Sequence, residues 1–264
     1  MTQIKIVTIN TWKCDGDYRA RMELLAEQLQ VLKPDIIACQ ECFHSGEGKA
    51  DTLKFLAERL NMHFSFLPGR QKKRRFEEKW VDSLSGLGVL SAYRICSVKG
   101  FNLPIVPGDE DRKALQVQIQ LPSGNNLCLT NTHLTHLGTT SAPRKKQAKE
   151  LADIARTNTN CPYNLVCGDF NAVIGSDEIN AFISGAKAVD CYTKGNGAEP
   201  RYSVTGAYEG NKFVCIDHIF ALPFPGENAY PDFINSGVVL NVIDPDTGLY
   251  PSDHFGISTM LVIS

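Results

Sequence analysis

The sequence predicts an α/β protein in which two β-sheets pack together and helices cover them. Three observations lead to this expectation. Strand-like and helix-like apolar patterns are mixed along most of the chain, the C-terminal third is mostly strand, and no repeat, low-complexity run or linker divides the sequence. A length of 264 residues suits one large domain or two small ones, and the absence of a linker favours a single domain over 1–264.

In the first quarter of the chain, two strands alternate with two helices. The stretch QIKIVTIN (3–10) alternates apolar and polar residues, and DIIAC (35–39) is a wholly apolar run, typical of a strand buried on both faces. Residues 17–32 and 50–60 place leucines at spacings of three and four, which is one face of a helix. Pro34 ends the first helix, because a proline disfavours helical geometry in the residue before it.

The middle of the chain predicts four strands and a helix. GLGVLS (86–91) is a short apolar run, and LQVQIQL (115–121) alternates cleanly. The turn residues PSGN connect the latter to NLCLTNTHL (126–134), so these two strands are candidates for a hairpin. Residues 143–157 then carry an alanine- and leucine-rich helical face, and YNLVCG (163–168) follows as a strand.

The last third predicts one short helix and three strands. Ser176 is the expected N-cap of a helix that runs through residue 185, because a serine side chain accepts a hydrogen bond from the first turn and acidic residues follow it. Strands are expected near 212–221, 234–241 and 255–263.

Composition limits the classes of function. A formal net charge of −2 argues against a surface built throughout to coat nucleic acid, although it permits a local basic patch. The sequence shows neither an export signal nor a run long enough to span a membrane. We therefore expect a cytoplasmic protein, a monomer, whose nine cysteines are reduced.

Polar side chains gather where the expected strands end. Carboxylates, carboxamides and imidazoles make up the set: Asn10, Glu41, His133, Asp169, Asn171, Asp217, Asp253 and His254. Oxygen ligands with few nitrogens and no thiolates suit Mg²⁺ or Mn²⁺ rather than Zn²⁺. An imidazole can move a proton near neutral pH. Together these groups favour metal-assisted hydrolysis of a phosphate ester.

Seven short motifs in order also carry a family resemblance. TINTW, PDIIACQE, GLGVLS, NTHL, GDFNA, DHIF and SDHFGI occur from Asn10 to His254. In this order and spacing the sequence resembles the endonuclease/exonuclease/phosphatase superfamily, which is deoxyribonuclease I-like. The resemblance implies a four-layer α/β sandwich, with two mostly antiparallel sheets packed face to face and helices outside.

The resemblance also implies a role for each of these residues. It implies a divalent cation, Mg²⁺ or Mn²⁺, held mainly by Glu41, with Asn10 and Asp253 nearby. Asp169 would orient or deprotonate the attacking water, and Asn171 and His133 would bind the scissile phosphate. His254 would act on the phosphate or as acid/base, with Asp217 accepting its ring N–H, which would fix the tautomer and stabilise imidazolium.

Two features qualify this picture. Several nuclease branches place an aspartate two residues after Asn10, where this chain has Trp12, which cannot ligate a metal. The dipeptide Asp-His also occurs twice, and neighbours on a strand point to opposite faces. We therefore expect His218 to point away from Asp217 and to be structural. His44 and His63 have no motif around them and are also expected to be structural, and His136 to lie on the surface.

The sequence CQEC contains a C-x-x-C spacing between Cys39 and Cys42. A thioredoxin-like redox pair would start a helix, whereas the following residues predict a loop. A zinc site would need a second pair, and none is suitably spaced. Buried free thiols are the favoured interpretation.

The stretch GRQKKRRFEEKW (69–80) is the main charge run, and its cations are candidate substrate-binding residues: Arg70, Lys72, Lys73, Arg74 and Arg75. A charge run is usually a solvated loop. This one precedes a strand that the resemblance places beside the active site, and Phe76 and Trp80 interleave with the cations. We expect it to bind an anionic part of the substrate.

The expected function is a Mg²⁺- or Mn²⁺-dependent phosphoesterase. Phosphodiesters are favoured over monoesters, and a nuclease acting on nucleic acid fits the basic run. A sphingomyelinase-like phospholipid phosphodiesterase is the alternative, and a non-catalytic binding module of the same fold or a thiol-redox protein ranks lower.

Overall fold

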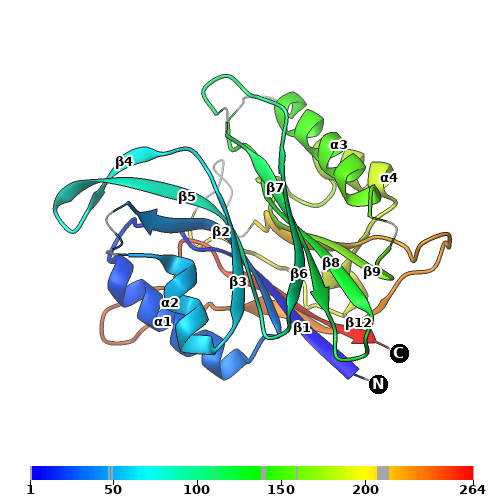
Figure 1. Ribbon diagram of the computed structural model, residues 1–264, viewed down its shortest axis with the longest axis horizontal. Coiled ribbons are helices and arrows are strands. Elements are labelled where there is room, and N and C mark those ends of the chain that lie inside the picture. Colours follow the sequence, from blue (N-terminus) through cyan, green and yellow to red (C-terminus); the bar gives the residue numbers. More distant parts are fainter. Residues whose placement is uncertain are drawn as a thin grey trace.

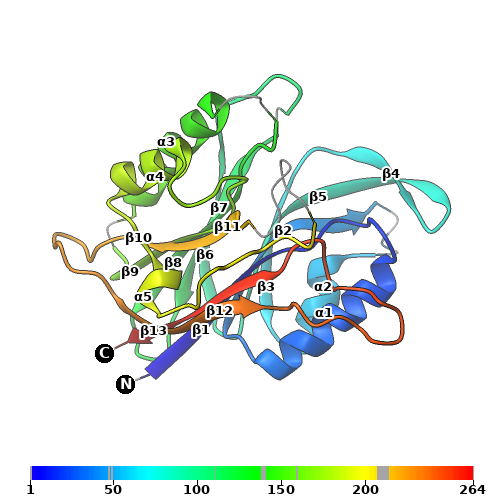
Figure 2. The same ribbon diagram turned by 180° about the vertical axis from the view of Figure 1, so that it is seen from behind.

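The computed structural model describes residues 2–46, 48, 50–109, 111–137, 141–158, 160–206 and 214–263. Two β-sheets pack face to face, with one helix pair outside each sheet, so that the layers run helix, sheet, sheet, helix (Figures 1 and 2). The two termini lie close together at one end of the sheets (Figure 1). This is the predicted α/β sandwich.

The first sheet contains seven strands, in the order β12-β13-β1-β2-β5-β3, with β4 paired to β5. Its strands are β1 (Thr2–Asn10), β2 (Ile36–Ser45), β3 (His63–Pro68), β4 (Lys72–Phe76), β5 (Lys79–Ser91), β12 (Asp232–Val239) and β13 (Gly256–Ile263). β1 and β2 are parallel, and the other pairings in this sheet are antiparallel.

The second sheet contains six strands, in the order β10-β11-β9-β8-β7-β6. Its strands are β6 (Ile95–Asn102), β7 (Lys113–Gln120), β8 (Asn126–His133), β9 (Tyr163–Asp169), β10 (Val189–Asp190) and β11 (Asp217–Ala221). β8 and β9 are parallel, while the remaining pairs are antiparallel. The predicted hairpin of the two strands around PSGN is the β7–β8 pair.

Helices cover the outer face of each sheet. α1 (Tyr18–Leu32) and α2 (Thr52–Leu60) lie on the first sheet, and α3 (Ala142–Arg156) and α4 (Asp177–Ala186) lie on the second; α5 (Cys191–Lys194) is a single turn. The predicted cap is confirmed, because Ser176 accepts a hydrogen bond from the backbone N–H of Ile179. Within the described residues, no helix has the length and apolar character needed to cross a bilayer.

Apolar side chains form three clusters, one between the sheets and one under each helix pair. The side chains of β1 contribute to two of these clusters. Ile4 and Ile6 face the second sheet, whereas Val7 and Ile9 face the helices. This double burial explains why the central strands are apolar on both faces.

A buried polar bridge between β2 and β8 crosses the interface between the sheets. The side-chain amide of Gln40, on β2, donates to Oδ1 of Asn131, on β8, at 2.7 Å. Asn131 in turn donates to the backbone oxygens of Cys39 and Gly88, at 2.8 and 2.9 Å. Gln40 and Asn131 are both fully buried.

The structure corrects several sequence expectations. Residues 69–80 are not a loop, because they contain β4 and the start of β5, and the predicted strand 86–91 is only the end of β5. β3, β6, β10 and α5 were not predicted. Of the strand expected near 212–221, residues 212 and 213 lie outside the described residues, and β11 begins at Asp217.

Candidate functional site

A row of three polar side chains crosses the second sheet. His133, the last residue of β8, is in register with Asp169 at the end of β9, which is in register with Asp217 at the start of β11. The neighbouring Cys167 and Ile219, two residues away on these strands, lie in the cluster between the sheets. Because side chains alternate along a strand, the row faces the first sheet.

A glycine makes this register possible. Gly168 has a φ of 137°, and a Cβ there would lie 2.0 Å from the backbone oxygen of Thr132. Only a residue without a side chain therefore allows β9 to lie this close to β8 just before Asp169.

The first sheet supplies the opposing side chains. Asn10 ends β1, and its Nδ2 donates to Oδ2 of Asp169 at 3.0 Å, so this contact joins the two sheets. The segment before β13 is held at the same place, because Ser252 Oγ donates to the backbone oxygen of Asn10 at 2.6 Å. That contact brings the adjacent Asp253 and His254 to the site.

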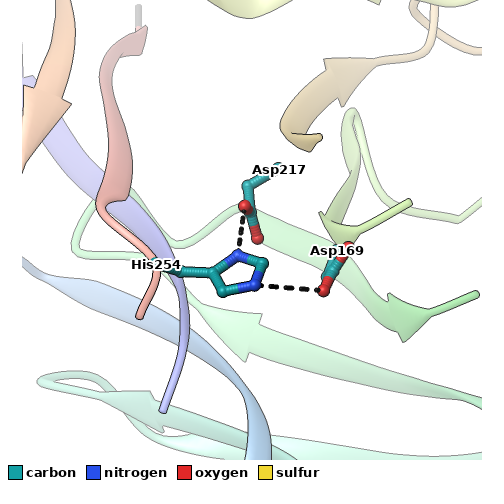
Figure 3. A group of neighbouring side chains, drawn as sticks. All are labelled: Asp169, Asp217 and His254. Atoms are coloured by element: carbon teal, nitrogen blue, oxygen red, sulfur yellow. Dashed lines mark hydrogen bonds and ion pairs between the residues drawn. The ribbon is translucent and has the colours of Figure 1, made fainter. Parts of the chain in front are cut away.

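His254 and two carboxylates form the centre of the site (Figure 3). Its Nδ1 lies 2.8 Å from Oδ2 of Asp217, and its Nε2 lies 3.9 Å from Oδ2 of Asp169. Burial opposes the charge on the ring, but the two carboxylates outweigh burial and raise the pKa of His254 to about 10. The geometry therefore favours an imidazolium oriented by Asp217.

Asp169 is a buried acid with several donors. Burial, together with the charge of Asp217, raises the pKa of Asp169 to about 6. Its Oδ1 accepts from the backbone N–H of Asn171 at 2.9 Å. Asn171 has a φ of 48°, which asparagine tolerates, and its Nδ2 donates to the backbone oxygen of Leu134 at 3.0 Å. The GDFN turn thus orients Asp169 and Asn171 together.

His133 differs from His254 in charge. Its Nε2 lies 3.4 Å from Oδ2 of Asp169, and its Nδ1 lies 4.0 Å from Oε1 of Glu41. Burial first, and then the positive charge of Arg112, lower the pKa of His133 well below its ordinary value. A neutral ring donates one hydrogen bond without adding a charge.

Glu41 reaches the site through an irregularity in β2. The pairing of β2 with β5 shifts register between Cys39 and Cys42, and Glu41 has a φ of 55°. A bulge of this kind redirects a side chain out of the ladder. Oε2 of Glu41 lies 2.9 Å from Nζ of Lys13, which also lies 3.7 Å from Asp15.

The surroundings of Glu41 suit a cation. Burial, with a further contribution from the charge of Glu41, raises the pKa of Asp253. Although burial would lower the pKa of Lys13, Glu41, Asp15 and Asp253 together raise it. The carboxylates of Glu41 and Asp253 thus both act on one positive charge, and oxygen donors of this kind are those that Mg²⁺ and Mn²⁺ prefer.

Asn10 fits a ligand role less directly. Its Oδ1 accepts from the backbone N–H of Trp12 at 3.0 Å, while its Nδ2 is bound to Asp169. Ligand atoms of Asp169, Asp217 and His254 lie within 4.8 Å of one another and form a second possible metal site. The hydrogen bond between His254 and Asp217 and the positive charge on His254 disfavour metal ligation by this group.

The two Asp-His dipeptides behave differently, as expected from alternation. His218 points away from the site, packs against Phe170 and Phe220, and lies 2.8 Å through Nε2 from the backbone oxygen of Ala172. Asp217, by contrast, faces His254.

The other histidines are distributed as follows. His44 contacts Asp51, His63 is exposed on β3, and His136 is exposed but lies 3.1 Å from a nitrogen of Arg112.

The C-x-x-C pair lies within β2, not at the start of a helix. Cys39 and Cys42 are both free and buried. Burial raises the pKa of Cys42 well above its ordinary value, and contact with Cys39 raises it further. Neutral, buried thiols are poor nucleophiles and poor metal ligands.

The basic run divides into two groups. Arg70, Lys72 and Arg74 line a cavity of about 280 Å³ that also includes Glu41 and His133. Lys73 is exposed opposite Asp82, and Arg75 pairs with Glu78 at 2.5 Å outside this cavity. Of the five candidate substrate-binding cations, Lys73 and Arg75 therefore lie outside this cavity.

Sequence reasoning missed four residues that shape the site. Lys13 contacts Glu41, and Arg112 lies beside His133. Ser203 Oγ donates to Oδ2 of Asp217 at 2.6 Å, and Arg21 binds the backbone around the site. The basic character of Lys13 and Arg112 is visible in the sequence, but nothing there indicates which strand end they reach.

Solved structures share this fold along the whole chain. An endonuclease/exonuclease/phosphatase family protein from Bacteroides thetaiotaomicron is 19% identical, with a TM-score of 0.75, and the match covers 100% of this chain and 98% of that one. A mannosyl-6-phosphatase from B. thetaiotaomicron VPI-5482 is 19% identical, with a TM-score of 0.70 and coverage of 98% and 100%. D. rerio TDP2, complexed with a single-strand DNA product, is 18% identical, with a TM-score of 0.71 and full coverage of both chains.

At these identities the likeness shows the fold alone, and no curated protein sequence matches the chain. The model of the Endonuclease/Exonuclease/phosphatase family, however, matches residues 7–254, which include every residue of the site described above. Because this match spans nearly the whole sequence, the chain belongs to the endonuclease/exonuclease/phosphatase family.

Proposed function

We propose that the protein is a divalent-metal-dependent phosphoester hydrolase and that its preferred substrates are phosphodiesters, with nucleic acid as the favoured class. Phosphoesterase hydrolases make up its family. The observation that carries the proposal is the position of the buried acid Asp169 near two imidazoles, with Nε2 of His133 at 3.4 Å and Nε2 of His254 at 3.9 Å, beside the carboxylates of Glu41 and Asp253.

In this proposal Glu41 and Asp253 would hold Mg²⁺ or Mn²⁺, with Asn10 next to them. The bound cation would stabilise negative charge on the phosphoryl oxygens as a Lewis acid. Removal of the cation by chelation should therefore abolish activity.

The protein's own groups manage the proton and the phosphate. Asp169 orients the attacking water and accepts its proton, with its carboxylate fixed by Asn10 and the backbone of Asn171. His254, charged and oriented by Asp217, donates toward the phosphate or the leaving oxygen. His133 and Asn171 bind phosphoryl oxygens as neutral donors.

Diesters and nucleic acid are favoured by the basic strand beside the site. The cavity that contains Glu41 and His133 continues along Arg70, Lys72 and Arg74. Cations placed beyond the scissile group suit a substrate that stays anionic on both sides of the broken bond. One protein of the same fold, TDP2, was crystallised with a single-strand DNA product, and another is a mannosyl-6-phosphatase. The fold alone therefore does not decide between a phosphodiester and a phosphomonoester substrate.

A substrate panel with Mg²⁺ or Mn²⁺ tests the proposal. It contains bis-p-nitrophenyl phosphate, p-nitrophenyl phosphate, single- and double-stranded DNA, RNA, sphingomyelin and sugar phosphates. We expect diester hydrolysis that EDTA abolishes and that Asp169→Asn and Glu41→Ala each reduce by about 10²-fold or more. Asp232→Asn, at an exposed acid on β12, is the control and should retain full activity.

Three results would contradict the proposal. Absence of hydrolysis of every substrate would leave a binding module of the same fold. Full activity in both site variants would place the chemistry elsewhere. Hydrolysis confined to sphingomyelin would favour the phospholipid phosphodiesterase.

A further inference from the structure

A cavity of about 280 Å³ extends the site away from His254. Glu41 and His133 lie at the end shared with the catalytic cluster, and β4 forms the far wall. β4 and the paired part of β5 extend beyond the body of the first sheet (Figure 1). The segment between β6 and β7, with Asp109 and Arg112, supplies the opposite wall.

The lining of this cavity is strongly basic. Among the described residues, six cations and three carboxylates line it: Lys13, Arg70, Lys72, Arg74, Arg112 and Lys113, with Glu41, Asp109 and Asp111. The three carboxylates are already engaged, by Lys13 at 2.9 Å, Arg112 at 2.7 Å and Lys113 at 3.2 Å respectively. These three pairs leave Lys72 and Arg74, the two cations that β4 contributes, without an ion pair to a carboxylate among the described residues of the lining.

β4 presents its cations by alternation. Lys72 and Arg74 face the cavity, whereas Lys73 and Arg75 project from the other face. Ser83 on β5 holds Lys72 and Arg74 in place. Its Oγ accepts a hydrogen bond from Nη1 of Arg74 at 2.9 Å and donates one to the backbone oxygen of Lys72, also at 2.9 Å. The contacts that hold Arg74 are with a serine, which leaves the guanidinium charge uncompensated by them.

The cations crowd one another. Burial lowers the pKa of Lys72, and the charges of Arg70 and Arg74 lower it further. Burial also lowers the pKa of the half-buried Arg74. Like charges placed together repel one another, and an anion bound between them relieves that repulsion.

We propose that this cavity binds a second phosphate group of the substrate, next to the one that is cleaved. The inference rests on the proposed function, because it takes the scissile phosphate to lie at His133 and Asp169. Arg74 offers the planar fork that pairs with phosphate oxygens, and Lys72 adds a compact charge. The volume of about 280 Å³ lies just below the usual range for drug-sized ligand sites, so it suits one phosphate and a short spacer such as a sugar.

Two sources supply this chemistry. The second phosphate belongs either to the next nucleotide of a single strand or to a small molecule with two phosphates. The experiment therefore compares compounds that differ only in the second phosphate. One pair is thymidine 5′-(p-nitrophenyl phosphate) with and without a 3′-phosphate. A second pair is ribose 5-phosphate and ribose 1,5-bisphosphate, and a single-stranded trinucleotide is the third arm.

For the wild-type protein we expect the second phosphate to lower KM by about tenfold or more, either within at least one pair or in the trinucleotide relative to thymidine 5′-(p-nitrophenyl phosphate). The double variant Lys72→Glu/Arg74→Glu should abolish this difference in KM. If the charge-reversed protein folds poorly, the milder Lys72→Gln/Arg74→Gln takes its place, and it should reduce the difference. Lys73→Glu/Arg75→Glu changes the net charge equally on the other face of the same strand, and it should keep the ratio. A gain with the trinucleotide alone identifies a strand as the source.

Two results would overturn the inference. One is an equal KM for both members of every pair and for the trinucleotide. The other is an equal loss of the KM ratio in Lys72→Glu/Arg74→Glu and in Lys73→Glu/Arg75→Glu. If no phosphoester is hydrolysed, the proposed function fails, but the cavity is still tested by calorimetry. Wild-type protein should then bind thymidine 3′,5′-bisphosphate at least tenfold more tightly than thymidine 5′-phosphate. Equal affinities, or a preference unchanged in Lys72→Gln/Arg74→Gln, would overturn the inference independently.

Discussion

Nη1 of Arg21 donates a hydrogen bond of 3.0 Å to the backbone oxygen of Pro251, which lies 230 positions further along the chain. The Arg21 guanidinium is almost completely buried and lies 4.7 Å from the ring centre of Trp12. It also donates to other backbone oxygens, those of Thr11, Trp12, Lys13 and Asp15. Arg21 thereby connects the segment after β1 to the segment that carries Asp253 and His254.

Replacing Arg21 should therefore destabilise the protein and misplace the site. Arg21→Met keeps much of the volume but leaves several buried carbonyl groups without a donor, which costs about 3 kcal/mol of unfolding free energy or more. Urea unfolding measures this loss, and kcat/KM on the best substrate should fall as well. Arg59→Met, at a more exposed arginine paired with Glu23, is the control. Equal stability of the two variants would contradict this role.

Asp217 should act through the orientation and charge of His254. In Asp217→Asn the amide cannot stabilise the imidazolium, so kcat should fall by about 10²-fold or more with a smaller change in KM. An NMR titration should show a lower pKa for His254 in this variant. Ser203→Ala removes one donor from the same carboxylate and should give a smaller effect on both measurements. An unchanged pKa for His254 would show that Asp217 does not control it.

His218 should make the protein less stable as the pH falls through the acidic range. Burial lowers the pKa of His218 to about 4, against about 6.5 in an unfolded chain. Between these values the unfolded state binds a proton that the folded state does not, so stability decreases as the pH falls from 6.5 to 4, by up to about 3 kcal/mol. At pH 7 both states are neutral and this contribution vanishes.

The measurement compares urea unfolding of the wild type with His218→Gln, which keeps a donor for the backbone oxygen of Ala172. The difference in stability between the two proteins should shift in favour of the variant as the pH falls from 7 to 4.5. His63→Gln, at an exposed histidine, should show no such shift. A pH-independent difference for His218→Gln would indicate an ordinary pKa.

Lys13 should compete with the metal for Glu41. Its ammonium lies 2.9 Å from Oε2 of Glu41, so a divalent ion that binds this carboxylate must displace it. Lys13→Met should therefore bind Mn²⁺ about tenfold more tightly, as measured by electron paramagnetic resonance of free Mn²⁺. Lys54→Met, at an exposed lysine of α2, is the control, and Glu41→Gln should weaken binding in either background. Unchanged or weaker affinity in Lys13→Met would exclude competition.

Much of the fold follows from local patterns, and the failures have identifiable causes. Alternation and helical spacing located the long buried elements because burial dictates those patterns. β4 was taken for a loop because its hairpin turn consists of Glu77 and Glu78, both with positive φ, where asparagine and glycine are the usual signals. β6 was missed because it is a largely exposed edge strand, in which little apolar alternation is required.

In the candidate site, too, local sequence patterns predict some features and not others. Alternation on β11 separates Asp217 from His218 within one dipeptide, so the different environments of these two residues could be predicted. The contacts of Lys13 and Arg21 could not, because they depend on how the segment after β1 meets β2 and the residues before β13. No local pattern encodes such long-range contacts.

The hydrogen bond from Gln40 to Asn131 has a consequence for the relative placement of the two sheets. Apolar packing between sheets tolerates small sliding movements, because it has no preferred direction. A buried amide pair is directional, and a displacement of one sheet by an ångström would leave its groups unsatisfied. Gln40 directly precedes Glu41, and Asn131 lies two residues before His133. Together with the contact of Asn10 with Asp169, this pair therefore sets the lateral alignment of the two halves of the site, and a packed but slipped sandwich would separate them.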